Sequence, residues 1–318
     1  MIQNIIICYK NLNLLKKGED GSVRRLKIID SDGIKITPVL PPNLTYLDLS
    51  IFFGRSVSNL EIPPTVKHVI FGSIKYYQDD NIDTKGLIFI HPPWENPTHR
   101  FLTRNGLLHW NYHWNHNKLC NLTHLKFGYY FNNILDKGVL PDCLTKLEFG
   151  TMFNKSISTD VLPSNLTYLK FGDNFNQPIT NNILPDGLSV LIFGNSFNQP
   201  IDINALPTSL SVLKFGIHFN SSLGSLFGGQ RSLEKKILPS GLTHLTLGHL
   251  FDQPLESFLS KSSFPNLTHI TLYQYKRQIL CDYLPSNLKY LIFDHPYDED
   301  IYKDIIGTRF FDITWIDD

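Results

Sequence analysis

The chain has no excess of charge of either sign, because 29 lysines and arginines balance 29 aspartates and glutamates over 318 residues. A nucleic-acid-binding surface normally shows as a basic excess, so we expect no nucleic-acid partner. The chain also lacks the run of about 18 apolar residues that a membrane-spanning helix needs. Its amino terminus has an apolar run of only Ile5–Cys8 without a basic segment before it, which is not typical of a signal peptide. We therefore expect no membrane partner.

Cysteine is scarce and scattered, at Cys8, Cys120, Cys143 and Cys281. Each cysteine lies in or near an apolar repeat position, so buried free thiols are favoured over disulfides. The sequence shows no Ser/His/Asp order and no paired carboxylates of the kind that general acid–base chemistry uses. These absences leave no candidate catalytic residue.

What the chain has instead is a repeat with a period of 22 residues. Four stretches align without a gap: LPDCLTKLEFGTMFNKSIST from Leu140, LPSNLTYLKFGDNFNQPITN from Leu162, LPDGLSVLIFGNSFNQPIDI from Leu184 and LPTSLSVLKFGIHFNSSLGS from Leu206. A fixed period of this size indicates a solenoid. Stacked coils then bury apolar faces that no single coil can bury. The register extends over about ten coils, and the segment VRRLKII predicts an early strand.

Within each repeat, a segment such as LTYLKF alternates apolar and polar residues, which indicates a half-buried strand. In this segment we expect Leu169 and Phe171 to point into the core, and Tyr168 and Lys170 to point outward. Prolines fix extended segments, and no clean coil has the periodicity of an ordinary helix. The sequence therefore predicts a mainly β protein, a parallel β-solenoid of leucine-rich-repeat-like coils of about 22 residues.

Two further positions recur in each repeat. An asparagine column follows the core phenylalanine, at Asn132, Asn154, Asn176, Asn198 and Asn220. We expect these side chains to bond unpaired backbone groups of a turn in the next coil. The glycine after each strand is expected to allow either a positive φ or a close approach of two backbones.

The pattern LPxxLxxLxFGxxFNQPI resembles the FNIP repeat family, which is known mainly from social amoebae and from giant viruses that infect amoebae. Phe175, Asn176, Pro178 and Ile179 carry the name-giving motif, with Gln177 in its middle. The resemblance implies a leucine-rich-repeat-like interaction module without catalytic residues. Some family members carry an F-box or a kinase domain ahead of the repeats. About 22 residues precede the first plausible coil here, and fewer than about 40 residues seldom fold alone.

The repeat register also predicts the domain organisation. Gly72 and Gly128 are 56 residues apart, or two periods plus 12, so the phase is interrupted between them. We expect one continuous solenoid domain with five parts: an N-terminal cap at 1–22, first coils at 23–75, a degenerate coil or insertion at 76–117, FNIP-type coils at 118–299 and a C-terminal cap at 300–318.

The insertion contains the segment HWNYHWNH. Its residues His109, His113 and His116 have a spacing compatible with zinc ligation. Alternatively, the segment is an aromatic loop that packs Trp110 and Trp114 against the solenoid. The segment has no cysteine, and we expect neither a metal nor a cofactor.

Two outward columns vary along the repeats, whereas the inward columns stay constant. The first outward column is Tyr46, His68, His124, Lys146, Tyr168, Val190, Val212, His244, His269 and Tyr290. The second outward column is Asp48, Ile70, Lys126, Glu148, Lys170, Ile192, Lys214, Thr246, Thr271 and Ile292. Their aromatic, histidine and aliphatic content is typical of an interface, although β-propensity also selects such residues.

The candidate partner-binding residues are Tyr46, His68, His124, Lys146, Tyr168, His244, His269 and Tyr290, with Trp110 and Trp114 of the insertion. We predict a non-enzymatic, intracellular scaffold that binds a protein partner through the outward strand face and the 76–117 insertion. One alternative is a substrate-recruiting adaptor of a ubiquitin-ligase complex. A more remote alternative is a polysaccharide-processing β-solenoid enzyme, which would need clustered acids, and only Asp48 and Glu148 are acidic in the two columns. The partner's identity and the oligomeric state stay open.

The cellular location is predicted from accidental glycosylation sites. The repeat creates Asn-Leu-Thr sequons at Asn43, Asn121, Asn165 and Asn266. In a secreted protein these sites would invite bulky sugars beside the strands. We expect a cytoplasmic or nuclear protein, in the host cytoplasm if the source is a virus.

Overall fold

The computed structural model describes residues 3–8, 23–29, 40–51, 62–71, 121–129, 131–223, 226–227, 230–231, 237–293 and 312–315. The chain divides into two compact units, Met1–Phe153 (unit 1) and Asn154–Asp318 (unit 2). The insertion at 76–117, with its histidine cluster, lies outside the described residues.

Unit 1 contains six described strands in one parallel ladder. In ladder order, which is also chain order, they are β1 (Gln3–Cys8), β2 (Val23–Ile29), β3 (Tyr46–Ile51), β4 (His68–Phe71), β5 (His124–Lys126) and β6 (Lys146–Glu148). The strand predicted from VRRLKII is β2. Strand β4 pairs directly with β5, although most of the residues between them belong to the insertion.

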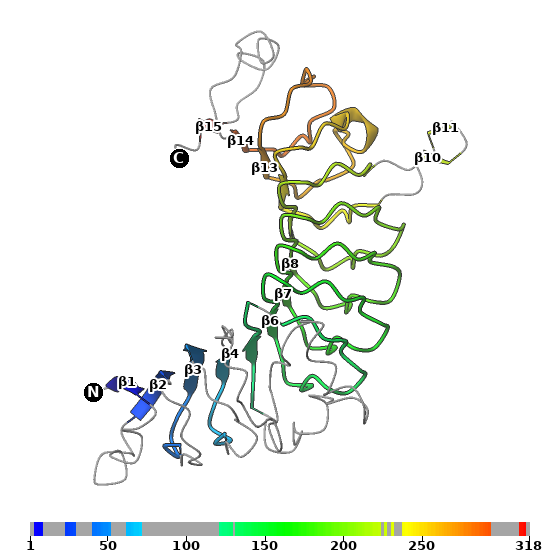
Figure 1. The fold of residues 1–318 in the computed structure, drawn as a ribbon. Coiled ribbons are helices and arrows are strands. Elements are labelled where there is room, and N and C mark those ends of the chain that lie inside the picture. The colour runs from blue at the N-terminus through cyan, green and yellow to red at the C-terminus, as the bar shows by residue number, and fades with distance from the viewer. Residues whose placement is uncertain are drawn as a thin grey trace, which may run out of the picture. The chain divides into compact units, whose positions relative to one another are not determined.

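Unit 2 contains a second parallel series and one hairpin. The parallel strands are β7 (Tyr168–Lys170), β8 (Val190–Ile192), β9 (Val212–Lys214), β12 (His244–Leu247), β13 (His269–Leu272), β14 (Tyr290–Phe293) and β15 (Asp312–Trp315). The hairpin pairs β10 (Leu226–Phe227) with β11 (Gln230–Arg231). Figure 1 shows the parallel strands of unit 2 along one side of the coils, with the turns and the hairpin β10–β11 on the other.

The ladder register is the repeat register. Tyr168 pairs with Val190 and Val190 with Val212, so each step along the ladder is one 22-residue repeat. Ile179 and Ile201 form a bridge of the same step on the other side of the coil. The described residues contain no α-helix, and only Leu255–Ser257 form a short 3-10 helix. The fold is therefore a mainly β, parallel β-solenoid of leucine-rich-repeat-like coils, as the sequence predicts.

The core consists of repeated columns of leucine and phenylalanine. Leu169, Phe171 and Phe175 are fully buried. Within a coil the rings of Phe171 and Phe175 stack with centroids 3.9 Å apart. Between coils the centroids of Phe175 and Phe197 are 6.1 Å apart with nearly parallel rings. Each buried side chain of this size contributes about 1.5–3 kcal/mol, and here each ring also packs against the next coil.

The glycine after each strand is required by close approach of backbones. A Cβ atom on Gly194 would lie 2.1 Å from the carbonyl oxygen of Gly172. On Gly216 it would lie 2.2 Å from the carbonyl oxygen of Gly194. Both distances are far shorter than a normal van der Waals contact between a carbon atom and an oxygen atom. The expectation of close approach is confirmed.

The asparagine column links each coil to the next. Oδ1 of Asn176 accepts the backbone N–H of Asn198 at 2.9 Å and the Nε2–H of Gln199 at 3.1 Å. Oδ1 of Asn154 accepts the equivalent donors of Asn176 and Gln177, both at 2.9 Å. The predicted bonds to the next coil's backbone are confirmed. The glutamine of FNQPI adds a second donor to each link, which the sequence analysis did not foresee.

A left-handed turn recurs in four successive coils and was not predicted. Asp160, Asn182 and Asn204 have φ of 62°, 66° and 67°, and Gly138 has φ of 78°. These four residues follow the same 22-residue step. Asparagine, aspartate and glycine tolerate this backbone region best, which explains why the otherwise variable turn keeps these residue types.

The prediction of buried free thiols is correct only in part for the two cysteines whose burial the structure describes. Cys143 and Cys281 are free thiols, but both are half-buried rather than buried. Cys143 lies in the turn before β6, where its Sγ–H donates to the carbonyl oxygen of Leu122 at 3.1 Å. This cysteine takes a turn position rather than a core position, which accounts for its exposure.

Candidate interaction surface

The outward residues of the strands form what we call the strand face, which consists of the first and second outward columns. The parallel register brings their members side by side. In unit 1, Tyr46, His68, His124 and Lys146 are consecutive ladder partners. In unit 2, the same column runs from Tyr168 through Val190, Val212, His244 and His269 to Tyr290. Eight of the ten candidate residues therefore lie in one position of the repeat. Trp110 and Trp114 lie outside the described residues.

Aromatic rings stack along the first outward column. In unit 2 the ring centroids of His244 and His269 are 4.1 Å apart, and those of His269 and Tyr290 are 4.5 Å apart. In unit 1 the rings of His68 and His124 are 4.2 Å apart. His244 is exposed, and His269 and Tyr290 are half-buried. Each unit therefore presents a short row of ring edges to solvent.

A hydroxyl column beside the strand face orients these rings. Thr243 Oγ1 donates to the carbonyl oxygen of Ser211 at 2.9 Å and lies 2.8 Å from Nδ1 of His244. The hydroxyl has one proton, so Nδ1 of His244 is the donor in the second bond. In this tautomer the lone pair of the ring is on Nε2. Thr268 and Thr123 also donate to a carbonyl oxygen of the preceding coil, that of Thr243 and that of Lys67. Each hydroxyl lies 2.8 Å from Nδ1 of the histidine that follows it, His269 or His124.

The hydroxyl column was missed by the sequence analysis. It comprises Thr45, Thr123, Thr145, Ser189, Ser211, Thr243 and Thr268, each bonded to the backbone carbonyl of the preceding coil. The available signal was the recurring Leu-Thr or Leu-Ser dipeptide immediately before each strand. Lys67 and Lys289 take this position in two coils.

Three histidines of the strand face have lowered pKa values. Burial is the largest cause of the lowered pKa of His68, His124 and His269. The second cause for His124 is the positive charge of His68, and nearby Glu148 acts in the opposite direction. For His269 the further causes are the positive charges of His244 and Lys289. These imidazoles therefore favour the neutral form more than a free histidine does.

The second outward column is only partly as predicted. Lys170 and Lys214 are exposed, and Ile192, Thr271 and Ile292 are half-buried. Thr246 is buried, with an exposed fraction of 9%, so its assignment to the outward surface was wrong. Its ladder partners are Lys214 and Thr271. The long stem of a lysine covers a short neighbouring side chain, which explains this burial.

The charges of the strand face are paired in unit 1. Lys27 lies 3.4 Å from Asp48, and Lys126 and Lys146 lie 3.7 and 2.8 Å from Glu148. Asp48 and Glu148, the two acids of the outward columns, are thus both engaged by lysines. They do not form a carboxylate pair of the kind that polysaccharide hydrolysis uses.

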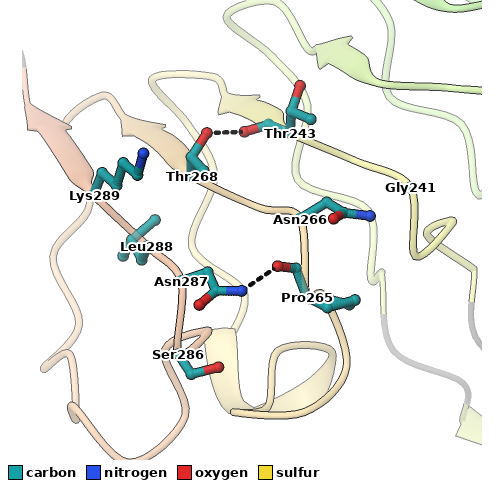
Figure 2. A pocket seen from close by; sticks show the side chains of 9 residues that line it. All are labelled: Gly241, Thr243, Pro265, Asn266, Thr268, Ser286, Asn287, Leu288 and Lys289. Atoms are coloured by element: carbon teal, nitrogen blue, oxygen red, sulfur yellow. Dashed lines mark hydrogen bonds between the residues drawn. The ribbon is translucent and has the colours of Figure 1, made fainter.

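A shallow groove of about 550 Å³ lies beside the strand face in unit 2. Its lining residues are Gly241, Thr243, Pro265, Asn266, Thr268, Ser286, Asn287, Leu288 and Lys289. Figure 2 shows these side chains on three successive turns, with bonds from Thr268 to Thr243 and from Asn287 to Pro265. The lining is rich in hydrogen-bonding groups and contains one cation and no carboxylate.

The described part of the chain contains neither a metal-binding cluster nor a membrane-spanning helix. No group of three or more histidine, cysteine, aspartate or glutamate side chains is arranged there to hold a metal ion. No helix there is long and apolar enough to cross a membrane. The histidine cluster at His109, His113 and His116 is outside this part, so its zinc hypothesis stays a prediction.

Solved structures similar to this chain include CroV588 and YopM. CroV588, described as a novel circular LRR protein, matches with 32% sequence identity and a TM-score of 0.58 over 86% of this chain. The match covers 37% of CroV588, so this chain spans little more than a third of its length. YopM from Yersinia enterocolitica WA-314 matches with 17% identity and a TM-score of 0.40, over 86% of this chain and 58% of YopM.

Sequence comparison identifies the repeat. No curated protein matches the chain in sequence. The family model of the FNIP repeat matches residues 120–152, 153–196, 175–218, 197–225, 230–266 and 259–295, which together are more than half of the chain. These matches cover the coils with the asparagine links and the stacked phenylalanines. The chain therefore belongs to the FNIP repeat family.

Proposed function

We propose that this protein is a non-enzymatic interaction scaffold that binds a partner protein through its strand face. The stacked rings of the first outward column carry this proposal. His244, His269 and Tyr290 form a row with centroid spacings of 4.1 and 4.5 Å at the surface. Aromatic side chains of this kind are enriched at protein interfaces. Leucine-rich-repeat-like solenoids generally act as interaction scaffolds, and their extended surfaces suit that role.

The strand face of unit 2 is smaller than a standard protein–protein interface, so binding a partner would require additional surface. The six adjacent strands from β7 to β14 cover about 24 Å at the usual spacing of about 4.8 Å. With strands about 13 Å long, the face has an area of about 300 Å². A standard interface buries about 800 Å² per partner. The groove beside β12–β14 and the insertion at 76–117 are the surfaces that we propose complete the interface.

We also propose an intracellular location, in the cytoplasm or the nucleus, or in the host cytoplasm for a viral protein. The sequon asparagines Asn43, Asn121, Asn165 and Asn266 are all exposed. The side chain of Asn121 donates to the carbonyl oxygen of Pro64 at 2.8 Å, and a glycan on that nitrogen would disturb the link between coils. Fluorescence microscopy of the tagged chain tests the location, and secretion in glycosylated form would contradict it.

Affinity capture from the native cell, followed by mass spectrometry, tests the scaffold role. The baits are the full chain, its Val212→Glu variant and a variant lacking 76–116. Val212 lies on the strand face between Val190 and His244. The control is Thr180→Glu, an exposed substitution about half a repeat from the strand. We expect a partner that the full chain and the control capture, and that Val212→Glu and the deletion capture less. Equal capture by all four folded baits would refute the proposal.

A further inference from the structure

The strand face of unit 2 differs from that of unit 1 in its charge. In unit 1 the second outward column has one lysine, Lys126, and it lies 3.7 Å from Glu148. In unit 2 the second outward column has two exposed lysines, Lys170 and Lys214, separated by Ile192. Neither lysine forms an ion pair within the described part of the chain. Within unit 2, these two cations therefore have no acid beside them in the outward columns from β7 to β14.

The surroundings of the ring stack are also positive. Strands β7 to β14 place no aspartate or glutamate in either outward column of unit 2. The charges that shift the pKa of His269 are those of His244 and Lys289, and both lower it. In unit 1, by contrast, Glu148 acts against the shift at His124. The next register position, on β15, is occupied by Asp312, which pairs with Tyr290 and ends the acid-free stretch.

The groove adds a third cation and several neutral donors. Lys289 lines it together with Asn266 and Ser286, and all three are exposed. Figure 2 shows that these residues come from neighbouring turns around one opening. Amide, hydroxyl and ammonium donors together suit a carboxylate, which only accepts hydrogen bonds when ionised.

We propose that the strand face of unit 2 binds an extended acidic segment of the partner protein. Carboxylates of the segment pair with Lys170, Lys214 and Lys289. Its aromatic or aliphatic side chains cover Val190, Val212 and the ring stack. This inference rests on the proposed function and specifies the class of partner.

The spacing of the lysines predicts the spacing of the acids. Lys170 and Lys214 are two strand steps apart, or about 10 Å. Lys214 and Lys289 are three strand steps apart across the ladder and three residues apart along the strand, which together give about 17 Å. An extended chain advances about 3.3 Å per residue. The segment should therefore carry acids about three and then about five residues apart. The aliphatic residues between the cations and the zero net charge of the chain favour such a peptide over a nucleic acid.

Selection from a random library of 12-residue peptides displayed on phage tests the inference, with the full chain as the target. We expect the selected peptides to be acidic, with interspersed aromatic or aliphatic residues. As synthetic peptides, they should bind K170E/K214E at least about tenfold more weakly than the unsubstituted chain, and should also weaken in 0.5 M NaCl. The variant K170R/K214R should retain binding. The matched control K155E/K276E changes the net charge equally at residues outside the strands of unit 2 and should leave binding unchanged.

The other outcomes separate the inference from the proposed function. Neutral or basic peptides that lose binding in Val212→Glu would overturn the acidic partner and leave the strand face as the binding surface. Peptides unaffected by every strand-face substitution would count against both. Acidic peptides that bind K170E/K214E and K155E/K276E equally would overturn the inference, as would failure to select any peptide. If a 12-nucleotide oligothymidylate bound more tightly than the peptides, and its binding depended on Lys170 and Lys214, the ligand of this face would be a nucleic acid and the inference would be overturned.

Discussion

At the scale of single residues, the asparagine links show how one side chain can join two coils. Oδ1 of Asn176 accepts from the backbone of Asn198 and from the side chain of Gln199. The repeat predicted this role. An asparagine that recurs at the same position of every clean coil indicates that its side chain makes the same hydrogen bond in each coil. The ring orientation of the histidines was not predictable in the same way. It depends on the hydroxyl of the preceding residue, which also bonds the preceding coil.

We expect Asn176→Ala to destabilise the protein by about 1 kcal/mol, measured as the free energy of unfolding in urea. The substitution leaves one backbone donor and one amide donor without their acceptor, and the partial exposure of the site keeps the cost near the low end. Asn176→Asp retains the acceptor and should cost less. Asn181→Ala, at an exposed asparagine of the same coil, is the control. Equal losses for Asn176→Ala and Asn181→Ala would show that the link contributes nothing.

At the scale of the coil, the glycine after the strand sets how closely neighbouring coils stack. The sequence left two explanations open, a positive φ and a close approach. Contact with the carbonyl oxygen of the preceding coil decides for the second, while the left-handed turn falls at Asp160, Asn182 and Asn204 instead. A single repeat does not reveal this difference, because both explanations favour glycine. It emerges only when the coils are stacked.

Gly194→Ala should therefore cost at least about 2–3 kcal/mol, because its Cβ would lie 2.1 Å from the carbonyl oxygen of Gly172 and the coils would have to separate. Gly187→Ala should change stability by less than about 1 kcal/mol, because its nearest contact is 3.6 Å away. Thermal and urea unfolding of the two variants measure the difference. Similar effects would mean that stacking distance is not set by this glycine.

The paired histidines of unit 1 should make stability depend on pH. The folded-state pKa values of His68 and His124 lie below the ordinary 6.5, mainly through burial. The unfolded chain therefore binds protons first as the pH falls. The stabilising contribution is fully present above about pH 6.5 and is lost between that pH and the lowered pKa. Neighbouring charges are Arg25, Lys67, Lys146 and Glu148.

The unfolding temperature should fall between pH 7.5 and pH 5.5, measured by circular dichroism in matched buffers. The double variant His68→Gln/His124→Gln should show a smaller fall, because it removes two of the groups that take up protons on unfolding. An equal fall in both proteins would assign the pH dependence to other groups.

At the scale of the whole molecule, the repeat made most of the fold predictable. The period places Leu169 and Phe175 in the core and Tyr168 on the strand face, because equivalent residues meet at every step of the ladder. Where the repeat fails, prediction also fails. The insertion at 76–117, with Trp110 and Trp114, has no counterpart in other coils to define its fold. Burial of Thr246 depends on the neighbouring coil's lysine, which the repeat does not conserve.

The repeat predicted which positions form the interaction surface, but it did not predict the charge pairing of that surface or the groove beside it. The outward columns follow from the alternation of the strand. The difference in charge pairing between the two units depends on which residues become ladder neighbours. Glu148 lies within reach of Lys126 and Lys146, whereas Lys214 lies between Ile192 and Thr246. The groove is formed by turns of successive coils, so no single repeat predicts it.

The affinity of the double variant His244→Ala/His269→Ala for the captured partner tests the central claim most directly, by isothermal titration calorimetry. Both rings lie on the strand face, so binding should weaken at least about tenfold while the unfolding temperature stays nearly unchanged. The control His218→Ala/His249→Ala removes the same side chains from turns that follow the strands β9 and β12, and it should bind normally. Unchanged affinity of His244→Ala/His269→Ala, or an equal loss in both double variants, would contradict the assignment of the strand face as the binding surface.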